Sequence, residues 1–262
     1  LAHYLAKNKA KYNDKEAWIL THKLSEAFQY YLLKASNKLA EERGACEYFN
    51  RTKYSEGIMP IDTYKKEVDD IVKEKLYYDW DGLRKSIREH GLRHSTLSAQ
   101  MPSESSSVVS NATNGIEPPR GFLSVKKSKK GPLKQIVPQY QSLKQYYTLL
   151  WDMPSNEGYI NTVAVMQKFF DQAISGNWSY NPTHFENNEV PMSVMMKDLL
   201  NTYKLGWKTS YYQNTYDYKT DDDIVFEEPA HSLGWHDETK DTTTPNREDF
   251  ASEEEYCEAC AI

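Results

Sequence analysis

The sequence predicts an α/β domain followed by an acidic C-terminal tail. Helical and strand-like segments alternate through the first 216 of the 262 residues, and this mixture is typical of α/β proteins. From residue 217 onward, acidic residues, threonine and proline replace apolar side chains, so we expect a flexible tail over residues 217–262. With 39% hydrophobic residues over its whole length, the chain can build a substantial core.

Helices dominate the first ninety residues. A helix is predicted over residues 14–43, with Gly44 as its stop, because apolar residues recur there at close to the helical period. Asp62 can cap a second helix that runs through residue 73, and Asp79 a third that ends before Gly91. The apolar positions that carry these predictions are Leu20, Leu24, Phe28, Tyr31, Val68, Ile71, Val72, Leu83 and Ile87.

The second half mixes strands with helices. Proline and glycine punctuate it, and a helix is predicted to begin at Pro191 and close at Gly206. Strands are expected over residues 92–100, 122–125, 133–137, 174–180 and 207–215. Further helices are expected just after residue 102 and over residues 140–151 and 158–173.

Charge and cysteine content indicate a soluble, cytoplasmic protein. No apolar stretch approaches the ~20 residues that span a bilayer, and three cysteines are too few for a disulfide-stapled secreted fold. Residues 217–262 hold 15 acidic and three basic residues, a net charge of −12, which leaves +6 on residues 1–216. A moderately basic body suits anionic small molecules, but the excess is too small to indicate nucleic-acid binding.

Residues 102–107 (PSESSS) form the first motif with chemical potential. Proline at a helix start leaves unpaired backbone N–H groups, which together with the helix dipole and the serine hydroxyls can bind a phosphate. The alternative is an ordinary capped helix start, which this motif alone does not exclude.

Tyr211 and Tyr212 form the second motif. Tyrosine can lose one electron together with its proton, so a neighbouring pair can relay a radical. Adjacent strand residues face opposite sides, however, unless the backbone twists the two rings together. Ordinary packing is the alternative, since the chain has 20 tyrosines.

The third motif is Cys257-x-x-Cys260 at the end of the acidic tail. Such a pair can close a disulfide and exchange it with another site. With His231 and His236 upstream, it could instead supply four zinc ligands. A stand-alone thiol-redox or zinc-binding adaptor is therefore the alternative function. Cys46, the remaining cysteine, is expected to be a packing residue.

Four segments, in order along the chain, closely resemble the large catalytic subunit of class I ribonucleotide reductases, especially bacterial and phage members. They are residues 57–64 (GIMPIDTY), 93–106 (RHSTLSAQMPSESS), 110–120 (SNATNGIEPPR) and 208–215 (KTSYYQNT), and the cysteine-ended tail is similar as well. The resemblance implies that Pro102, Ser103, Glu104, Ser105 and Ser106 hold the phosphates of a ribonucleoside diphosphate.

The resemblance also implies a radical path. Tyr212 would receive the radical from the small subunit, which carries a di-metal centre and a tyrosyl radical, and Tyr211 would pass it toward an active-site cysteine. Cys257 and Cys260 would reduce the disulfide left after each turnover, and thioredoxin or glutaredoxin would reduce them in turn. No cofactor is expected on this chain itself.

The family's thiyl-radical cysteine, its neighbouring catalytic residues and its regulatory cone precede the region that matches here. The resemblance therefore implies the second half of a ten-stranded α/β barrel in residues 1–216, with a small α+β insertion around residues 120–175 and the flexible redox tail. We expect a split or excerpted subunit that is inactive without an N-terminal half and the small subunit.

Overall fold

The computed structural model describes residues 1–128 and 131–217, which belong to one compact unit, Leu1–Asp217. Its mixture of helices and strands confirms the α/β class. The α-helices are α1 (Ala2–Lys7), α2 (Lys15–Arg43), α3 (Pro60–Thr63), α4 (Val68–Ile71), α5 (Trp80–His90), α6 (Glu104–Val109), α7 (Tyr140–Leu143), α8 (Glu157–Gln167) and α9 (Met192–Lys204). Short 3-10 helices are η1 (Phe49–Arg51), η2 (Lys53–Glu56), η3 (Lys144–Tyr146), η4 (Leu150–Asp152), η5 (Pro182–His184) and η6 (Glu186–Asn188).

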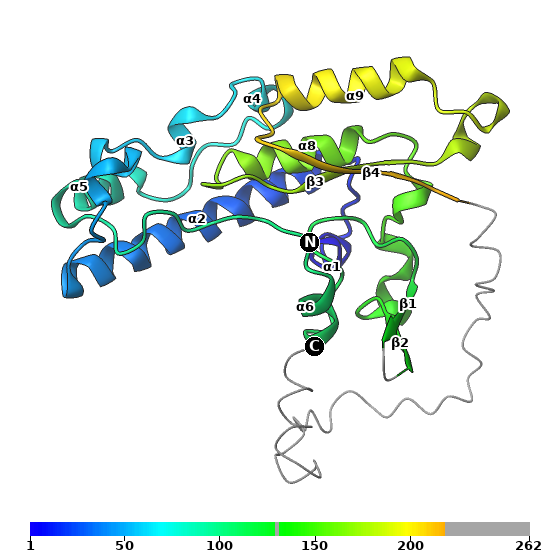
Figure 1. The fold of residues 1–262 in the computed structure, drawn as a ribbon, viewed down its shortest axis with the longest axis horizontal. Coiled ribbons are helices and arrows are strands. Elements are labelled where there is room, and N and C mark those ends of the chain that lie inside the picture. The colour runs from blue at the N-terminus through cyan, green and yellow to red at the C-terminus, as the bar shows by residue number, and fades with distance from the viewer. Residues whose placement is uncertain (129–130, 218–262) are drawn as a thin grey trace, which may run out of the picture. The chain divides into compact units, whose positions relative to one another are not determined.

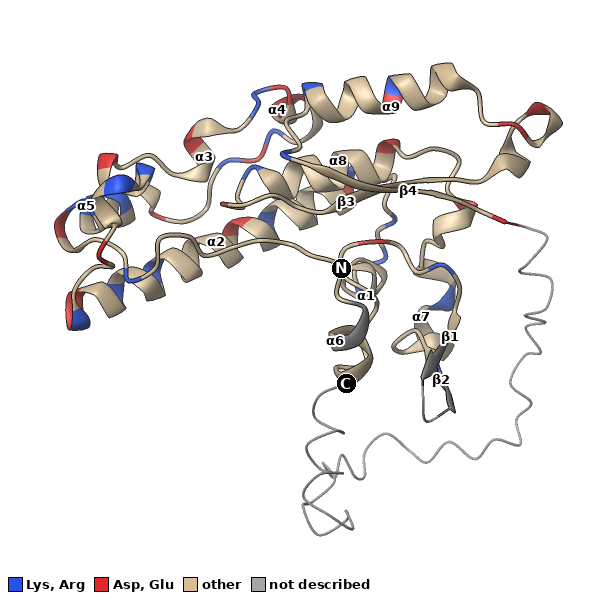
Figure 2. Ribbon diagram, in the orientation of Figure 1, with Lys and Arg blue, Asp and Glu red and all other residues tan. Residues whose placement is uncertain are grey.

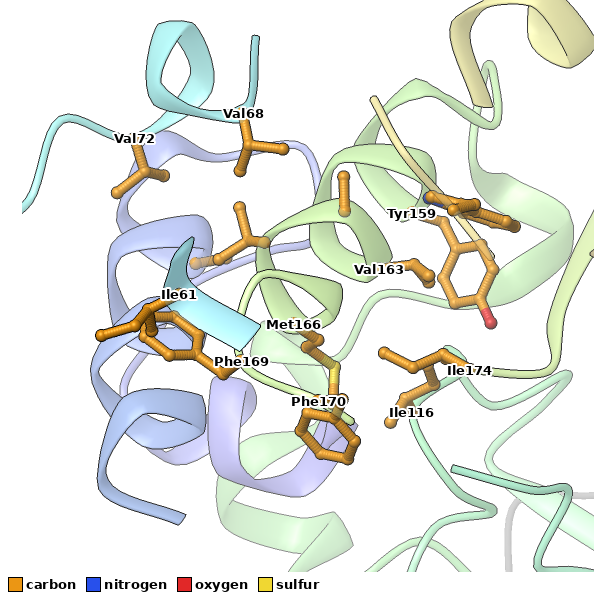
Figure 3. Packing of buried hydrophobic residues seen from close by; sticks show 14 of the residues in the cluster. Ile61, Val68, Val72, Ile116, Tyr159, Val163, Met166, Phe169, Phe170 and Ile174 are labelled. Carbon is orange, nitrogen blue, oxygen red and sulfur yellow. The ribbon is translucent and has the colours of Figure 1, made fainter. Parts of the chain in front are cut away.

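Helix α8 forms the centre of the core. It lies between α2 and α9 (Figure 1), and every residue from Gly158 to Gln167 is buried. A helix that is buried on all sides requires neighbours on all sides, and α2, α4 and α9 all contact it. Figure 3 shows Met166, Phe169 and Phe170 at its C-terminal end and Ile174 beside Ile116.

Helix α2 is present as predicted, but it buries its polar face. Leu24, Phe28 and Tyr31, which suggested the helix, are exposed. On the buried side, the Glu26 carboxylate accepts hydrogen bonds from the backbone N–H groups of Tyr77 and Tyr78 and from Nε1 of Trp80. Gln29 accepts one from Ser98 at 2.6 Å. These bonds offset the cost of burying the polar groups.

His22, also on the buried face of α2, makes the stability of the fold depend on pH. The rings of His22 and Phe169 are nearly perpendicular, with their centroids 4.9 Å apart. Neither ring nitrogen of His22 has a hydrogen-bond partner among the described residues. Burial, assisted by the nearby Lys168 ammonium, lowers the pKa of His22 from 6.5 to about 4. Between these two values the unfolded chain binds the proton more readily than the folded chain does.

We therefore expect the contribution of His22 to the free energy of unfolding to be constant above pH 6.5. As the pH drops toward 4, the free energy of unfolding should fall by up to about 3 kcal/mol. Urea unfolding at pH 7.5 and pH 5 measures this loss. His22→Leu should remove it, whereas His184→Gln, at an exposed position, should leave it unchanged. An equal loss in His22→Leu would contradict this assignment.

The helix expected from Asp62 through residue 73 is wrong, because two short helices, α3 and α4, replace it. Asp62 lies inside α3, where its carboxylate accepts the Met59 backbone N–H at 2.8 Å and pairs with Arg84 at 2.6 Å. The backbone is extended at Tyr64, and the hydroxyl of this residue donates to Asp69 at 2.7 Å. Helix α5, by contrast, begins as predicted, with Asp79 accepting the Gly82 N–H at 2.8 Å.

The strand expected before Gln100 is also wrong. In this part of the described chain only Gln100 pairs, through a single bridge to Ile174. The Asp171 carboxylate takes the backbone donors that a strand would need, from Leu97 at 2.7 Å and from Ser98 at 3.4 Å. A distant side chain therefore replaces the expected ladder.

Two other helices are shorter than predicted. Helix α7 and the turns η3 and η4 replace the one expected over residues 140–151, with extended backbone at Tyr147 and Leu149. Helix α8 ends at Gln167, six residues before the predicted end at residue 173, and the side-chain amide of Gln167 donates to the carbonyls of Phe170 and Gln172.

Among the described residues, the strands form two sheets of two strands each. The predicted hairpin is present as β1 (Leu123–Ser128) and β2 (Gly131–Ile136), which are antiparallel. The predicted strands β3 (Gly176–Tyr180) and β4 (Ser210–Thr215) are parallel and are connected through α9. No described helix combines the length and apolarity needed to cross a membrane.

Buried polar bonds join β3 to α9. Asp198 of α9 accepts hydrogen bonds from Asn156 at 2.9 Å and from the Tyr180 hydroxyl at 3.1 Å, and Thr202 accepts one from Nε1 of Trp178 at 3.2 Å. These contacts attach β3 to α9.

Candidate functional site

A bulge in β4 brings Tyr211 and Tyr212 together. Gly176 pairs with Ser210, but the next paired residues are Trp178 and Gln213, so the two tyrosines lie opposite a single residue of β3. Regular alternation would have placed the rings on opposite faces. A bulge inserts one extra residue and re-aims the neighbouring side chains. The twist that sequence reasoning left open is therefore present.

The two phenols are in direct contact. Their hydroxyl oxygens are 2.9 Å apart in a hydrogen bond, and their ring centroids are 3.8 Å apart with the planes tilted by 44°. Both side chains are about half exposed. The hydrogen bond to Tyr212 raises the pKa of Tyr211 above its ordinary value. Neither strand contributes a charged residue, and the ribbon of β4 in Figure 2 is accordingly tan.

Asn177 occupies the β3 position opposite the bulge. Its Oδ1 accepts the backbone N–H of Tyr212 at 2.9 Å, and its Nδ2 donates to Oε1 of Glu117. Asn177 is buried, with 9% of its surface exposed. Sequence reasoning missed this residue, because a single asparagine in a short strand has no pattern that sets it apart.

The predicted phosphate segment begins helix α6. Ser103 is the N-cap, and its carbonyl accepts the Ser107 backbone N–H at 3.0 Å. Ser106 is exposed, and its hydroxyl contacts the Ser103 carbonyl at 3.4 Å. The first N–H groups of a helix have no partner within it, so this end can donate to an anion. Pro102 is exposed just before the N-cap, whereas the side chains of Glu104 and Ser105 are outside the described ones.

The loop of residues 114–117 contacts both the phosphate segment and the residue behind the tyrosine pair. Asn114 accepts a hydrogen bond from the Ser103 hydroxyl at 3.5 Å. Gly115 comes so close to the same serine that an added Cβ would lie 3.3 Å from its Oγ. Two residues further on, Glu117 contacts Asn177 behind the tyrosine pair. The phosphate segment and the tyrosines therefore share a support.

The cysteine pair of the tail, Cys257 and Cys260, lies outside the described residues, and so do His231 and His236 of the zinc alternative. Within residues 1–128 and 131–217, no group of three or more His, Cys, Asp or Glu side chains could hold a metal ion. Cys46 is half-buried, and its backbone N–H donates to Leu92 at 2.9 Å.

Comparison with known proteins places the chain in a family. The model of the family described as "Ribonucleotide reductase, barrel domain" matches residues 1–213. The ribonucleoside-diphosphate reductase subunit alpha of Haemophilus influenzae is 62% identical over 216 residues, which cover 82% of this chain and 29% of the relative. Subunit alpha of reductase 1 from Escherichia coli is 60% identical over 226 residues (86% and 30%), and that of Enterobacteria phage T4 is 46% identical over 230 residues (87% and 30%).

This chain thus spans less than a third of the length of these relatives. The resemblance seen in the sequence is confirmed by a family match over most of the chain and by two relatives at 60% identity or more. The chain belongs to the ribonucleotide reductase family and corresponds to part of its large-subunit barrel domain.

Proposed function

We propose that this chain supplies the substrate-phosphate segment and the radical-transfer tyrosines of a class I ribonucleoside-diphosphate reductase. The complete enzyme would convert ribonucleoside diphosphates into deoxyribonucleoside diphosphates for DNA synthesis. The observation that carries the proposal is the hydrogen-bonded pair of Tyr211 and Tyr212, whose rings are in contact, in a chain of this family. In the complete subunit, residues 1–216 would form the second half of a ten-stranded α/β barrel.

The tyrosine geometry suits transfer of an electron together with a proton. When Tyr212 is the radical, Tyr211 gives it one electron through the two contacting rings and one proton across the 2.9 Å hydrogen bond. Tyr212 is then a neutral phenol, and Tyr211 is a neutral radical. No charge builds up on either residue. The raised pKa of Tyr211 helps, because the proton is still present when the electron leaves.

The start of α6 would bind the substrate phosphates. Free backbone N–H groups and the helix dipole favour an anion there, and the hydroxyls of Ser103, Ser105 and Ser106 would add donors. Glu104 belongs to the same segment, between Ser103 and Ser105, and Pro102 presets the turn that precedes the helix.

Exposed apolar faces support a need for partners. Tyr212 is about half exposed, so a small subunit carrying the tyrosyl radical and its di-metal centre can reach it. Large apolar patches on a protein surface mark contact sites. On α2 the exposed residues are Leu24, Phe28 and Tyr31, and on α9 they are Met192, Met196, Leu199, Leu200 and Tyr203. An N-terminal portion of the large subunit and the small subunit are the partners that we propose.

The tail would reduce the active-site disulfide after each turnover. Cys257 and Cys260 would reduce the active-site disulfide by thiol exchange and would then be reduced by thioredoxin or glutaredoxin. Residues 217–262 hold 15 acidic and three basic residues, and this high net charge suits a tail that moves between the active site and its reductant.

Reconstitution tests the proposal. The chain is mixed with an N-terminal half of a reductase alpha subunit and with a matching small subunit, and formation of deoxycytidine diphosphate is measured with dithiothreitol as reductant. We expect activity only in the full mixture. Inactivity of the full mixture, alongside an active intact enzyme, would contradict the proposal.

The same assay tests the phosphate segment. Because a hydrogen bond to a charged group contributes about 1.5–3 kcal/mol, Ser106→Ala should raise KM for cytidine diphosphate about tenfold or more. Ser110→Ala is the matched control: it removes a hydroxyl from the other end of α6, where this group bonds to the Ser106 carbonyl at 2.9 Å. Equal KM values for the two variants would argue against a phosphate site at Ser106.

A further inference from the structure

The side chain of Asn177 fits its surroundings in only one orientation. The backbone N–H of Tyr212 is a donor and requires the amide oxygen, whereas the carboxylate of Glu117 is an acceptor and requires the amide nitrogen. Both groups of the carboxamide are therefore used. No other side chain of the same size offers one acceptor and one donor in this arrangement, since aspartate has only acceptors and leucine has neither.

Glu117 is held from both sides along the chain. The carbonyl of the preceding Ile116 accepts a hydrogen bond from the buried Tyr12 hydroxyl at 2.7 Å. Two prolines follow, whose rings fix φ, and the Pro119 carbonyl accepts the Leu150 backbone N–H at 2.9 Å. The carboxylate that orients Asn177 is thus attached to a fixed piece of backbone.

The bulge takes the backbone N–H of Tyr212 out of the regular β-ladder, and the hydrogen bond to Asn177 gives this donor a partner. A bulged residue falls outside the regular ladder, and a backbone N–H without a partner costs about 1–3 kcal/mol when it is buried. Without the Asn177 oxygen, regular pairing of β4 with β3 would be favoured over the bulge. Regular pairing places adjacent residues on opposite faces and separates the two phenols.

We propose that Asn177 is a positioning residue for the tyrosine pair: together with Glu117, it fixes the bulge in β4 that brings the ring of Tyr211 against the ring of Tyr212. The consequence for turnover rests on the proposed radical-transfer function. The geometric part does not, and it can be tested on this chain alone.

Nuclear magnetic resonance of the full chain, labelled with carbon-13 throughout the tyrosine rings, tests the geometry. Tyr211→Phe and Tyr212→Phe identify the two signals. In Asn177→Ala we expect the contacts between the two rings to disappear and the pKa of Tyr211 to fall toward its ordinary value. An intact ring contact with an unchanged Tyr211 pKa would overturn the proposal.

Asn177→Asp should separate the rings as well, because a carboxylate can accept from Tyr212 but repels Glu117. Glu117→Gln is the conservative variant: its amide oxygen still accepts from Asn177, so the pair should survive. Asn181→Ala is the matched control, since Asn181 follows β3 and donates to the Trp151 carbonyl at 2.9 Å. Its tyrosine pair should be unchanged.

The signals of the buried Tyr12 and Tyr159 report whether each variant is folded. If Asn177→Ala loses them, Glu117→Ala replaces it as the test, because it removes the group that orients Asn177 and leaves the asparagine in place. Glu117→Ala should weaken the ring contact, whereas Glu117→Gln should keep it. Equal ring contacts in these two variants would overturn the proposal.

The reconstituted reductase then separates the two proposals. Asn177→Ala should lower kcat by about 100-fold with an unchanged KM for cytidine diphosphate, since a misplacement of about 1 Å can cost that much. If the rings separate and kcat does not change, the positioning role stands and the radical-transfer function fails. If the rings stay together, the positioning role fails whatever the activity.

Discussion

Tyr211→Phe and Tyr212→Phe should each abolish nucleotide reduction by the assembled enzyme, with kcat falling at least about 10³-fold, or about 4 kcal/mol in the activation barrier. Phenylalanine has no O–H, so it can neither release a proton with its electron nor complete the hydrogen bond between residues 211 and 212. Each ring is about half exposed, and loss of one hydroxyl there should change stability little. Binding of the small subunit should therefore persist.

The measurement is deoxycytidine diphosphate formation with dithiothreitol, together with the radical content of the small subunit before and after mixing. Tyr216→Phe is the control, since Tyr216 immediately follows the same strand and packs on Trp151 at 5.3 Å, away from the pair. The Tyr216→Phe enzyme should retain activity. By contrast, a Tyr211→Phe enzyme that kept more than about a tenth of the wild-type kcat would show that the radical takes another route.

Cys257→Ser should remove the activity that thioredoxin supports and spare the activity that dithiothreitol supports. Serine cannot form the thiolate that attacks a disulfide, so the active site would remain oxidised after its first turnover. Multiple-turnover activity with thioredoxin should fall at least about 100-fold, because each further cycle requires that exchange. The small-molecule reductant can reach the active site without the tail.

The control for this experiment is Cys46→Ser, which should keep both activities, because Cys46 is half-buried and lies outside the proposed redox set. Loss of both activities in Cys257→Ser would indicate a structural role for the tail. A zinc ion bound to the full chain and lost in both Cys257→Ser and His231→Ala would favour the adaptor alternative.

The tyrosine pair could be named from the sequence, but its arrangement could not. Alternation along a strand predicts one ring on each face, and Tyr211 and Tyr212 depart from it because one residue of β3 lies opposite two of β4. The cause is the side chain of Asn177, more than thirty residues away in sequence. Local patterns cannot reveal a contact of this kind.

Helix α2 shows a second limit of sequence reasoning. The helical period correctly predicted its existence, yet Leu24, Phe28 and Tyr31 point outward, and Glu26 and Gln29 are buried. The apolar face of a helix identifies its core side only when the chain includes every segment that packs on that helix. This chain spans less than a third of its relatives, so a face that is exposed here can be an interior face in a complete subunit.

The strand predicted before Gln100 and the helix predicted from Asp62 failed for different reasons. The Asp171 carboxylate, more than seventy residues away in sequence, takes the backbone donors of Leu97 and Ser98. Asp62 does begin a helix, by accepting the Met59 N–H, but this helix ends at Tyr64, where the backbone is extended and the hydroxyl donates to Asp69. Local propensity does not include contacts that side chains make outside their own turn. The capped helix α5, whose signals are all local, was predicted closely.

The bulge in β4 makes the length of this strand as important as its composition. Substitutions around the tyrosines alter one side chain at a time, and the neighbouring backbone can absorb many of them. Deletion of a single residue just before Tyr211 would instead shift the strand by one position against β3 and turn one phenol to the far face, with both phenols still present. Natural variation in this segment should therefore consist of exchanges, and insertions or deletions should be absent wherever the tyrosine relay is in use.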